Sequence, residues 1–396
     1  MNLDKKMIKN NIPRIRFNNF EAFWVEKRIA DIVKISAGGD VDKVKLKESG
    51  KYPVIANALT NKGIVGFYED YKVKAPAVTV TGRGDVGYAV ARHENFTPIV
   101  RLLTLQSEKI DVDYLENQIN SMRILNESTG VPQLTAPQLG NYKVYYPEIE
   151  EQSAIGSLFR TLDDLLASYK DNLANYQSLK ATMLSKMFPK AGQTVPEIRL
   201  NGFDGEWEVQ SLKELASFSK GNGYTKSDLV NSGNEIILYG QLYTNYQTVI
   251  SMVNTFVLET REKSVISKGG EVVVPASGES AEDISRASVI EKSGVIIGGD
   301  LNIIYPNENK VNSIFLALTI SNGSQQKELI KRAQGKSVVH LRNNDLEKVV
   351  LHYPSMEEQR AIGLYFSNLD NLINSHQEKI SQLETLKKKL LQDMFI

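Results

Sequence analysis

Two pairs of matching segments show that the chain is an internal duplication, and this feature constrains the possible folds more than any other. In the first pair, residues 13–24 (PRIRFNNFEAFW) match residues 196–207 (PEIRLNGFDGEW). The match places the two tryptophans of the chain, Trp24 and Trp207, at equivalent positions. The same register continues from Ser36 to Ser219 and from Gly38 to Gly221.

The second pair is the stronger of the two. Residues 146–166 match residues 353–373, and the register extends to a Met-Phe pair at 187–188 and 394–395. Between 150 and 188, sixteen of thirty-nine positions are identical in the second copy. The offset grows from 183 to 207 between the two pairs, so the intervening region is 24 residues longer in the second copy (207 − 183). Each copy therefore has similar ends and a diverged middle.

The second pair of segments has the pattern of two long paired helices. Pro147 and Pro354 suit a helix start, and the Glu-Glu pairs that follow complement the positive end of the helix dipole. Apolar residues then recur at coiled-coil spacing. The predicted pairing residues are Ile155, Leu158, Leu162, Leu165, Tyr169, Tyr176, Leu179 and Met183 in the first copy, and Ile362, Tyr365, Leu369, Leu372, Leu383, Leu386 and Leu390 in the second. Polar residues interrupt both series at the same step, at Asn172 and at His376 with Lys379.

The spacing of the segments predicts how the two helices run. About eight residues separate Phe188 from Pro196, and they span at most roughly 28 Å. The second globular region must then start near the far end of the first helix, and its own helix begins beside it. We therefore expect an antiparallel coiled coil with the two globular domains at opposite ends, related by a pseudo-two-fold axis. A helix of about 38 residues is roughly 57 Å long, which limits their separation. Two amphipathic helices packed separately on their own domains are the alternative.

The diverged regions carry short β-type runs punctuated by glycine, such as residues 77–91, 271–278 and 294–306. Residues 112–122 and 312–321 are candidates for short helices. The expected fold class is therefore α+β, with a curved, partly antiparallel sheet in each domain. The predicted organisation is a flexible segment 1–12, a first recognition domain 13–147, a long helix and linker 148–190, a second recognition domain 191–354, and a second long helix 355–396.

Composition excludes several classes of protein. The chain contains no cysteine, which excludes disulfides and thiolate metal sites, and its four histidines lack ligand spacing. No apolar run is long enough for a membrane span, and the polar N-terminal segment is not a secretory signal, so a cytoplasmic location is expected. The overall charge is balanced, but residues 1–147 carry 21 basic and 16 acidic side chains, a net charge of +5. This distribution permits DNA binding without demanding it.

Two similar but diverged domains joined by a rigid spacer suit the recognition of a bipartite DNA site with two different halves. The sequence resembles the specificity subunits of type I restriction-modification systems over nearly its whole length. The likeness rests on two motifs, each present twice. One is a tryptophan motif at Trp24, Ile29, Asp31 and Ile32 and at Trp207, Leu212, Glu214 and Leu215. The other is a helix start at Pro147, Glu150, Glu151, Gln152, Ala154, Ile155 and Gly156 and at Pro354, Glu357, Glu358, Gln359, Ala361, Ile362 and Gly363.

This resemblance implies a subunit without catalysis of its own. Its expected partners are double-stranded DNA with a bipartite asymmetric site, two methyltransferase subunits, and restriction subunits that supply motor and nuclease activity. The resemblance implies no cofactor bound by this chain, and a partner methyltransferase that uses S-adenosylmethionine to modify adenine. Phe159 and Phe366 stand at matching helix positions and are predicted to dock the partners.

The residues themselves show no catalytic motif. The chain lacks a glycine-rich cofactor loop and the aromatic-flanked Pro-Pro motif of base-flipping methyltransferases. The Gly-Lys-Ser at 335–337 lacks the earlier glycine of a phosphate loop, since Ile330 stands there. The adjacent carboxylates Asp163 and Asp164 point apart on a helix, which favours a solvated face over a metal site.

Candidate DNA contacts are polar residues near glycine-bearing turns, because such side chains can read base edges. They are Lys34, Ser36, Thr81, Arg83, Arg92, Thr129 and Gln133 in the first domain, and Lys220, Tyr224, Lys226, Tyr239, Gln241, Tyr243, Ser277, Arg286 and Lys336 in the second. For each of them, an ordinary loop residue is the alternative interpretation. Two other functions stay open: a freestanding sequence-specific DNA-binding protein, and a coiled-coil scaffold whose end domains bind proteins.

Overall fold

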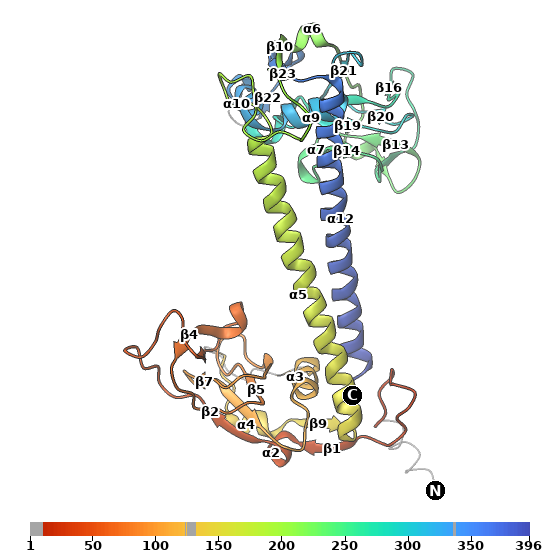
Figure 1. Cartoon of the computed structure of the whole chain (residues 1–396). Helices are drawn as coiled ribbons and strands as arrows, with labels where there is room; N and C mark the ends of the chain where they lie inside the picture. Colours follow the sequence, from red (N-terminus) through yellow and green to blue (C-terminus); the bar gives the residue numbers. More distant parts are fainter. Residues whose placement is uncertain (1–10, 123, 125–131, 336–337) are drawn as a thin grey trace. The chain divides into compact units, whose positions relative to one another are not determined.

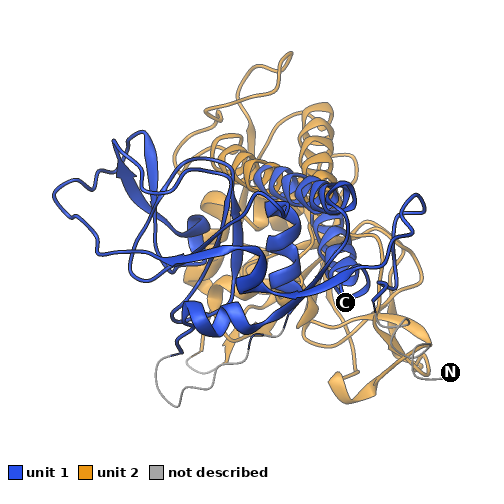
Figure 2. Ribbon diagram, turned by 90° about the horizontal axis from the view of Figure 1, so that it is seen from below, with its two compact units in different colours: residues 1–171, 377–396 blue, residues 172–376 orange. Residues whose placement is uncertain are grey.

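The computed structural model describes residues 11–122, 124, 132–335 and 338–396 (Figure 1). The chain divides into two compact units, which are considered separately (Figure 2). Unit 1 comprises residues 1–171 and 377–396, and unit 2 comprises residues 172–376. Each long helix, α5 (Ile149–Lys186) and α12 (Met356–Asp393), contributes one end to each unit. Among the described residues, no helix has the length and apolarity needed to span a bilayer.

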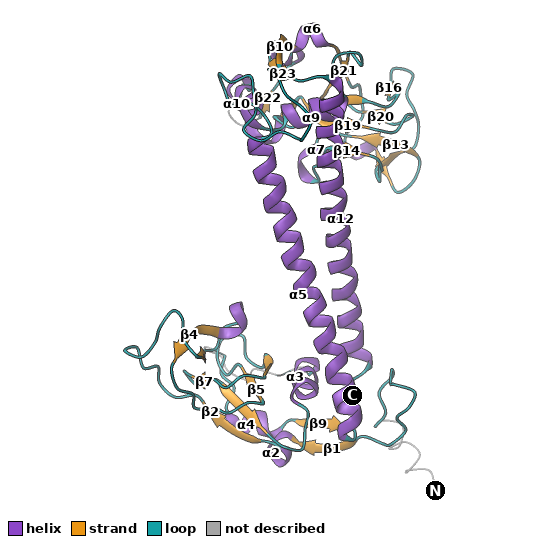
Figure 3. Cartoon of the chain, viewed as in Figure 1, coloured by secondary structure: helices purple, strands orange, loops and turns teal. Residues whose placement is uncertain are grey.

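Unit 1 is a mixed α and β structure that contains two sheets of three or more strands and several short helices (Figure 3). Its antiparallel four-stranded sheet has the order β2-β8-β5-β6, and its three-stranded sheet has the order β4-β3-β7. A separate antiparallel pair, β1 with β9, joins the two ends of the globular part. The strands are β1 (Val25–Arg28), β2 (Lys34–Ala37), β3 (Tyr52–Ile55), β4 (Ile64–Tyr68), β5 (Ala77–Val80), β6 (Ala89–Arg92), β7 (Thr97–Pro98), β8 (Leu103–Gln106) and β9 (Lys143–Tyr146). The short helices are α2 (Ile29–Ile32), η2 (Thr60–Gly63), α3 (Val112–Ser121) and α4 (Ala136–Asn141).

Unit 2 has the same arrangement of strands as unit 1, with further strands and helices added to it. Four of its strands, β11-β21-β17-β19, have the order and pairing of β2-β8-β5-β6, and the parallel pair β13 and β20 corresponds to β3 and β7. The strands are β10 (Glu208–Ser211), β11 (Ala216–Lys220), β12 (Leu229–Val230), β13 (Asn234–Ile237), β14 (Val249–Ile250), β15 (Phe256–Val257), β16 (Val265–Ile266), β17 (Glu271–Pro275), β18 (Ser277–Gly278), β19 (Ser288–Ile290), β20 (Ile296–Ile297), β21 (Leu301–Pro306), β22 (Val339–His340) and β23 (Val350–Tyr353). The short helices are α6 (Leu212–Leu215), η3 (Lys226–Asp228), α7 (Gln241–Thr244), α8 (Ala281–Ile284), α9 (Ser313–Ile320), α10 (Gly323–Arg332) and α11 (Asn343–Leu346). The helices α8 and α10 have no counterpart among the described residues of unit 1, and they account for part of the extra length.

The helices predicted at 112–122 and 312–321 are confirmed as α3 and α9, and each begins at a side-chain cap. The Asp111 carboxylate accepts a hydrogen bond from the Tyr114 N–H, and the Asn312 side chain accepts from the Phe315 N–H at 3.1 Å. Such caps satisfy backbone donors that a helix start leaves without partners.

The helix-start motif has a direct structural explanation. The Gln152 side chain accepts a hydrogen bond from the Asp111 N–H at 3.0 Å, and Gln359 accepts in the same way from the Asn312 N–H at 2.9 Å. Gly156 lets α3 approach, because a Cβ there would lie 2.6 Å from Asp111 Oδ1. The repeated Gln therefore fastens each long helix to the short helix of its own unit, and the close approach requires a glycine in unit 1.

An arginine–glutamate pair explains two further residues of the duplication. Arg16 donates two hydrogen bonds to Glu151 at 2.6 and 2.7 Å, and Arg199 does the same to Glu358 at 2.7 and 2.6 Å. Both carboxylates are about 1% exposed. Because a buried charge must be paired, each pair fixes the segment that precedes a tryptophan against the start of a long helix.

Each core is completed by an aromatic residue from the end of the other copy's helix. In unit 1, Phe395 of the second copy packs on Phe159 with ring centroids 5.6 Å apart, and Trp24 lies in the same core. In unit 2, Phe188 of the first copy packs on Phe366 at 6.2 Å and on Trp207 at 6.3 Å. The repeated Met-Phe segments are therefore core residues of the unit opposite to their own copy.

Within each unit the two helix segments run antiparallel. In unit 1, Asp163 pairs with Lys387 and Lys170 pairs with Glu384. A later residue of α5 thus pairs with an earlier residue of α12. In unit 2, Tyr176 lies against His376 with ring centroids 5.2 Å apart, and Lys180 pairs with Asp370. The contacts within each unit therefore agree with the antiparallel helix direction expected from the sequence.

The packing series along each helix corrects six of the fifteen predicted pairing residues. Buried and half-buried positions recur at alternating steps of four and three. They are Ile155, Phe159, Leu162, Leu166, Tyr169, Leu173, Tyr176, Lys180, Met183 and Met187, and Ile362, Phe366, Leu369, Ile373, His376, Ile380, Leu383, Lys387, Leu390 and Met394. The predicted residues within this series are Ile155, Leu162, Tyr169, Tyr176, Met183, Ile362, Leu369, Leu383 and Leu390. Each of the other six predicted residues immediately precedes a residue of the packing series in the sequence.

Those alternate positions have other surroundings. Leu158 and Tyr365 pack against the edge of their own unit's core. Leu165, Leu179, Leu372 and Leu386 are between 41% and 44% exposed and do not belong to the series. Asn172 and Lys379 are also exposed, so they do not interrupt it. Its lysines are Lys180 and Lys387, which occupy equivalent positions in the two copies.

The prediction that Phe159 and Phe366 dock a partner is wrong for this structure. Both side chains are 0% exposed and lie in the cores described above. An aromatic ring at a four-residue step from Ile155 or Ile362 points along the packing series, and the sequence interpretation had placed it one position outside.

Candidate nucleic-acid interface

In unit 1, five loops meet at one end of the four-stranded sheet and form a surface that we name loop cluster 1. It comprises residues 38–39, 56–63, 81–87, 99–102 and 132–134. Hydrogen bonds join them: the Gly38 N–H donates to the Leu102 carbonyl at 2.8 Å, and the Leu134 N–H donates to the Gly82 carbonyl at 2.9 Å. The Asn57 side chain joins two further loops, since it donates to the Val100 carbonyl and accepts from the Gly82 N–H.

Unit 2 has the corresponding surface, loop cluster 2, built from residues 221–224, 239–243, 276–278, 298–301 and 338–341. The matching bonds are present: the Gly221 N–H donates to the Leu301 carbonyl at 2.9 Å, and the Leu341 N–H donates to the Ala276 carbonyl at 3.0 Å. The two clusters therefore share one backbone framework although their sequences differ.

Close backbone approach explains the glycine that both copies keep at the start of each cluster. A Cβ on Gly38 would lie 2.7 Å from the backbone of Pro98, and a Cβ on Gly221 would lie 1.9 Å from the Gly298 carbonyl oxygen. Neither position can hold a side chain without moving the adjacent loop.

Backbone strain concentrates in these two clusters. Six non-glycine residues of the described chain have left-handed φ values, and all six lie in the clusters. They are Asn61, Lys62, Val100 and Arg101 in cluster 1, and Tyr224 and Asp300 in cluster 2. Arg101 and Asp300 occupy equivalent positions, with φ values of 61° and 57°. Strain of this kind costs of order 1–3 kcal/mol per residue and gathers at functional sites, which marks the clusters as candidate binding surfaces.

The exposed side chains of cluster 1 are mainly hydrogen-bond donors. Arg83 lies opposite Gln133 in an isolated antiparallel bridge, and both side chains are exposed. Arg101 is exposed on the adjoining loop. Arginine pairs with guanine edges and glutamine with adenine edges in the major groove, so the cluster has the chemistry of base recognition.

Cluster 2 places different side chains at the same positions. Ser277 and His340 form the bridge that corresponds to Arg83 and Gln133. Asp300 replaces Arg101. The rings of Tyr239 and Tyr243 have centroids 6.3 Å apart, and a Cβ on Gly278, next to Ser277, would lie 3.9 Å from the Tyr243 ring. Burial raises the pKa of Tyr243, and the neighbouring Tyr239 adds to this effect, so its hydroxyl stays protonated.

The predicted contacts in the first domain divide into several groups. Thr129 lies outside the described residues. Arg83 and Gln133 belong to cluster 1, whereas Thr81 is buried there with its hydroxyl bonded to the Asp85 carbonyl. Ser36 is exposed on β2. Lys34 lies at the other end of β2, in a separate pocket that also contains His93 and Asp113, so the structure does not bring it to the cluster.

Burial removes Arg92 from direct base contact, which corrects its predicted role. Its residue exposure is 9%, and its guanidinium donates to the Thr79 hydroxyl at 2.9 Å and to the Lys62 carbonyl at 2.8 Å. Desolvation lowers the pKa of Arg92 to about 10, which leaves the side chain charged at neutral pH.

In the second domain, six predicted residues lie in or beside cluster 2. Tyr239, Tyr243 and Ser277 belong to it, although Ser277 is only 7% exposed, and Lys220 is exposed beside Gly221. Lys226 is exposed on η3. Lys336 lies outside the described residues.

Two of the predicted contacts in cluster 2 have structural roles instead. Tyr224 is buried, donates to the Glu259 carbonyl, and carries Arg261 4.3 Å above its ring. Both ends of the Gln241 amide are used, by the Leu238 N–H and the Thr255 hydroxyl. These side chains shape the loops and are not directed at a ligand.

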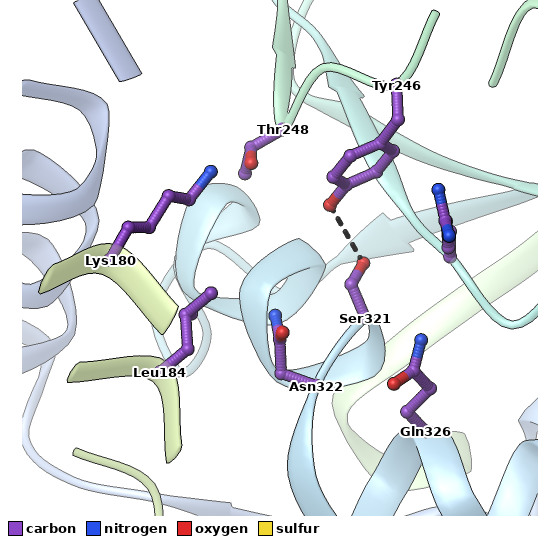
Figure 4. Close-up of a pocket in the computed structure, with 8 residues that line it drawn as sticks. Lys180, Leu184, Tyr246, Thr248, Ser321, Asn322 and Gln326 are labelled. Carbon is purple, nitrogen blue, oxygen red and sulfur yellow. Dashed lines mark hydrogen bonds between the residues drawn. The ribbon is translucent and has the colours of Figure 1, made fainter. Parts of the chain in front are cut away.

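Arg286 lies apart from cluster 2, in a pocket of about 240 Å³ beside the end of α5 (Figure 4). Lys180 and Leu184 of α5 line one side, and Tyr246 donates a hydrogen bond to Ser321 at 3.1 Å on the other. The Lys180 ammonium is paired with Asp370. In the part of the chain that the structure describes, no group of acidic and histidine side chains has the arrangement of a metal site.

The sequence interpretation missed Asn57, Arg101, Asp300 and His340. Arg101 and Asp300 stand out through a left-handed backbone. Aspartate adopts this conformation more often than most residues, but an arginine gives no reliable sequence signal for it. His340 becomes visible as a candidate only when β22 pairs with β18, a contact across more than sixty residues.

The described residues thus form a duplicated α+β framework that presents different side chains at equivalent loop positions. The chain belongs to the family of type I restriction-modification DNA specificity domains, whose model matches residues 22–175 and 204–385.

Known relatives agree over nearly the full length. The chain is 22% identical over 399 residues to the type I restriction enzyme MjaVIII specificity subunit of Methanocaldococcus jannaschii, covering 93% of this chain and 91% of that protein. It is 20% identical over 422 residues to the putative type I restriction enzyme MjaX specificity subunit of the same organism, covering 97% and 95%. The crystal structure of the S subunit of a type I restriction-modification system from M. genitalium has the same fold, with a TM-score of 0.68 at 15% identity over 97% of this chain and 99% of that one.

Proposed function

We propose that the chain is the DNA-recognition subunit of a type I restriction-modification complex and that each loop cluster reads one half of a bipartite site. One observation carries the proposal: clusters 1 and 2 share a backbone framework but differ in side chains at equivalent positions, with Arg83 and Gln133 replaced by Ser277 and His340. Such a pair of surfaces suits an asymmetric site.

The two clusters favour different half-site chemistry. Arg83, Arg101 and Gln133 offer donors to guanine and adenine edges. In cluster 2, Asp300 offers an acceptor that suits the cytosine amino group, and Lys220 offers a donor. Phosphate contacts set position without reading sequence, so the difference in base specificity should reside in these exposed side chains.

The long helices are proposed to act as an antiparallel, pseudo-two-fold coiled-coil spacer that fixes the unread gap. Support comes from the packing series of alternating steps and from the ion pairs that the two copies exchange, Asp163 with Lys387 and Asp370 with Lys180. A helix of about 38 residues is roughly 57 Å long, a length between one and two turns of B-DNA.

Exposed leucines replace the phenylalanines as the proposed docking residues for methyltransferase subunits. Leu165, Leu179, Leu372 and Leu386 each precede a packing position by one residue. Positions of this kind lie on the same side of an antiparallel helix pair, so Leu165 and Leu386 flank one face in unit 1, and Leu179 and Leu372 do so in unit 2. An apolar stripe left exposed on charged helices suits a partner's helices.

The proposed complex contains two methyltransferase subunits, with restriction subunits added for cleavage, and this chain contributes no catalysis. The methyl donor, S-adenosylmethionine, is expected to bind the partner methyltransferase.

Methylome sequencing tests the proposal directly, in cells that carry the chain and its methyltransferase, with and without this chain. We expect a bipartite methylated motif with a fixed gap that disappears when the chain is deleted. Arg83→Ala should alter one half of the motif, and His340→Ala the other. An unchanged methylation pattern in both comparisons would favour a freestanding DNA-binding protein or a protein-binding scaffold.

Docking has its own test in copurification with the methyltransferase. The double variant Leu165→Glu and Leu386→Glu should lose one methyltransferase copy while the thermal midpoint stays within a few degrees, because these side chains are exposed. The control is Ala167→Glu with Thr385→Glu, which changes exposed residues elsewhere on the same helices. Equal binding by both double variants would rule out the leucine face.

A further inference from the structure

The turn η2 in cluster 1 is held in an unusual backbone conformation. Asn61, Lys62 and Gly63 have consecutive φ values of 49°, 50° and 78°, all in the left-handed region. The left-handed conformation costs a residue such as Lys62 of order 1–2 kcal/mol, whereas asparagine adopts it more readily. A surface turn that keeps such a conformation must be fixed by contacts from the remainder of the fold.

Buried Arg92 supplies one of those contacts. Its side chain starts on β6, crosses the neighbouring strand β5 at Thr79, and ends on the carbonyl of Lys62 at 2.8 Å. A hydrogen bond from a charged guanidinium is stronger than one between neutral groups. The bond is made to the backbone of the strained turn, so Arg92 fixes the turn's conformation and leaves its side chains free.

The side chains of the turn face solvent. Leu59, Thr60, Asn61 and Lys62 are exposed, and within the described chain Lys62 has no carboxylate partner. The turn adjoins the base-reading part of cluster 1, because Asn57 at its base bonds to both the Val100 and Gly82 loops. An unpaired lysine beside a base-reading surface has the chemistry of a phosphate contact.

The described part of unit 2 has neither the buried arginine nor the left-handed turn. By strand register, the position of Arg92 is taken by Ile290, since both residues pair with the first residue of the equivalent central strand. The turn η2 is replaced by the helix α7, which contains no left-handed residue. The buried arginine and the strained turn therefore occur together in unit 1 and are absent together from the described part of unit 2.

We propose that the turn 59–63 is a DNA-backbone contact of unit 1, in which Lys62 binds a phosphate flanking the first half-site and Arg92 is the positioning residue that holds the turn in place. The inference rests on the proposed DNA-recognition function and adds a contact that is independent of base identity. Its ligand is the phosphodiester backbone of duplex DNA.

The test uses the complex of the full chain with its methyltransferase and a duplex that carries the methylated bipartite site. Lys62→Ala should weaken binding about tenfold and lower the slope of log affinity against log salt by about one, because one phosphate contact is lost. Arg92→Gln should produce the same change with Lys62 still present. Lys74→Ala is the matched control, because this exposed lysine precedes β5 at the end of the sheet away from cluster 1, and it should leave the slope unchanged.

A rescue variant separates positioning from general stability. Asn61→Gly in the Arg92→Gln background makes the left-handed conformation of the turn easier to adopt, since glycine adopts left-handed φ at little cost, and it should restore part of the lost affinity. If Lys62→Ala leaves affinity and salt slope unchanged while the unaltered complex binds its site selectively, the contact does not exist. If Arg92→Gln weakens binding without rescue by Asn61→Gly, the positioning role is refuted. Failure of the unaltered complex to prefer the site would refute the proposed function itself.

Discussion

Lys387 of α12 pairs with Asp163 of α5, and the same ion pair recurs between Lys180 and Asp370 with the roles of the two copies exchanged. Both lysines occupy the packing series, where an apolar residue would otherwise stand. Polar residues at such positions commonly fix register and partner at some cost in stability.

Reversing one charge should therefore destabilise one unit selectively. We predict that Lys387→Glu lowers the free energy of unfolding of unit 1 by about 1–2 kcal/mol, because attraction becomes repulsion at a partly exposed site. Asp163→Lys in the same chain should recover about half of the loss. Hydrogen–deuterium exchange of peptides from the two units gives the readout. Lys180→Glu is the matched variant, and it should loosen unit 2 instead.

The buried Arg16–Glu151 pair should be far more sensitive. Removing Arg16 as Arg16→Ala leaves Glu151 charged and about 1% exposed, and a loss of about 3 kcal/mol is expected. Arg199→Ala should have the same effect on unit 2 through Glu358. Denaturant unfolding followed by exchange in each unit checks both. A loss below about 1 kcal/mol in either variant would show that the carboxylate is readily hydrated or protonated.

Two equivalent glycines should respond differently to the same substitution. A Cβ at Gly156 would lie 2.6 Å from Asp111 Oδ1 and 2.9 Å from the Tyr114 nitrogen, whereas the nearest atom to a Cβ at Gly363 is 3.4 Å away. Gly156→Ala should destabilise unit 1 by about 1–3 kcal/mol, and Gly363→Ala should be neutral or slightly stabilising. Thermal unfolding of the two variants tests this prediction. Equal melting midpoints would contradict the close approach of Asp111 and Tyr114 to Gly156.

Glu116 of α3 should make unit 1 sensitive to pH. Burial, reinforced by the charge of Asp163, raises the pKa of Glu116 from its ordinary 4.5 to about 7. The folded chain then holds the proton more tightly than the unfolded chain does. The free energy of unfolding should fall as pH rises from about 4.5 to about 7, and this contribution should stay low at higher pH.

Glu116→Gln should remove that dependence. The variant is expected to be more stable than the parent chain at pH 8 by about 2 kcal/mol, and similar to it at pH 4.5. Chemical denaturation at pH 4.5, 6, 7 and 8 measures the trend. Parallel profiles for both proteins would show that another group controls the dependence.

The duplication, the α+β class and the helices α3 and α9 could all be predicted, because each depends on local spacing and capping. The phase of the helix packing could not. Leu158 and Phe159 are adjacent and both apolar, as are Leu165 and Leu166, so steps of three-four and four-three fit the sequence equally well. Only contact with the second helix selects Phe159 and Leu166.

The binding surface was predictable in outline and not in detail. Polar residues near glycine turns led to Arg83, Gln133 and Ser277, which lie in the clusters. The same criterion selected Arg92 and Tyr224, because sequence does not show whether a polar side chain turns inward to satisfy a loop's backbone. The search for polar residues near glycine turns did not select Asp300, whose left-handed backbone depends on long-range packing.

The Met-Phe segments carry a consequence for how the chain is made. Unit 1 starts to emerge from the ribosome first, yet Met394 and Phe395 complete its core, some 370 residues after Trp24. Trp24, Tyr114 and Phe159 must therefore wait, incompletely covered, while the whole of unit 2 is synthesised. The first unit to be translated is the last that can finish folding, so a nascent or truncated chain would present an aromatic surface that chaperones and proteases can recognise.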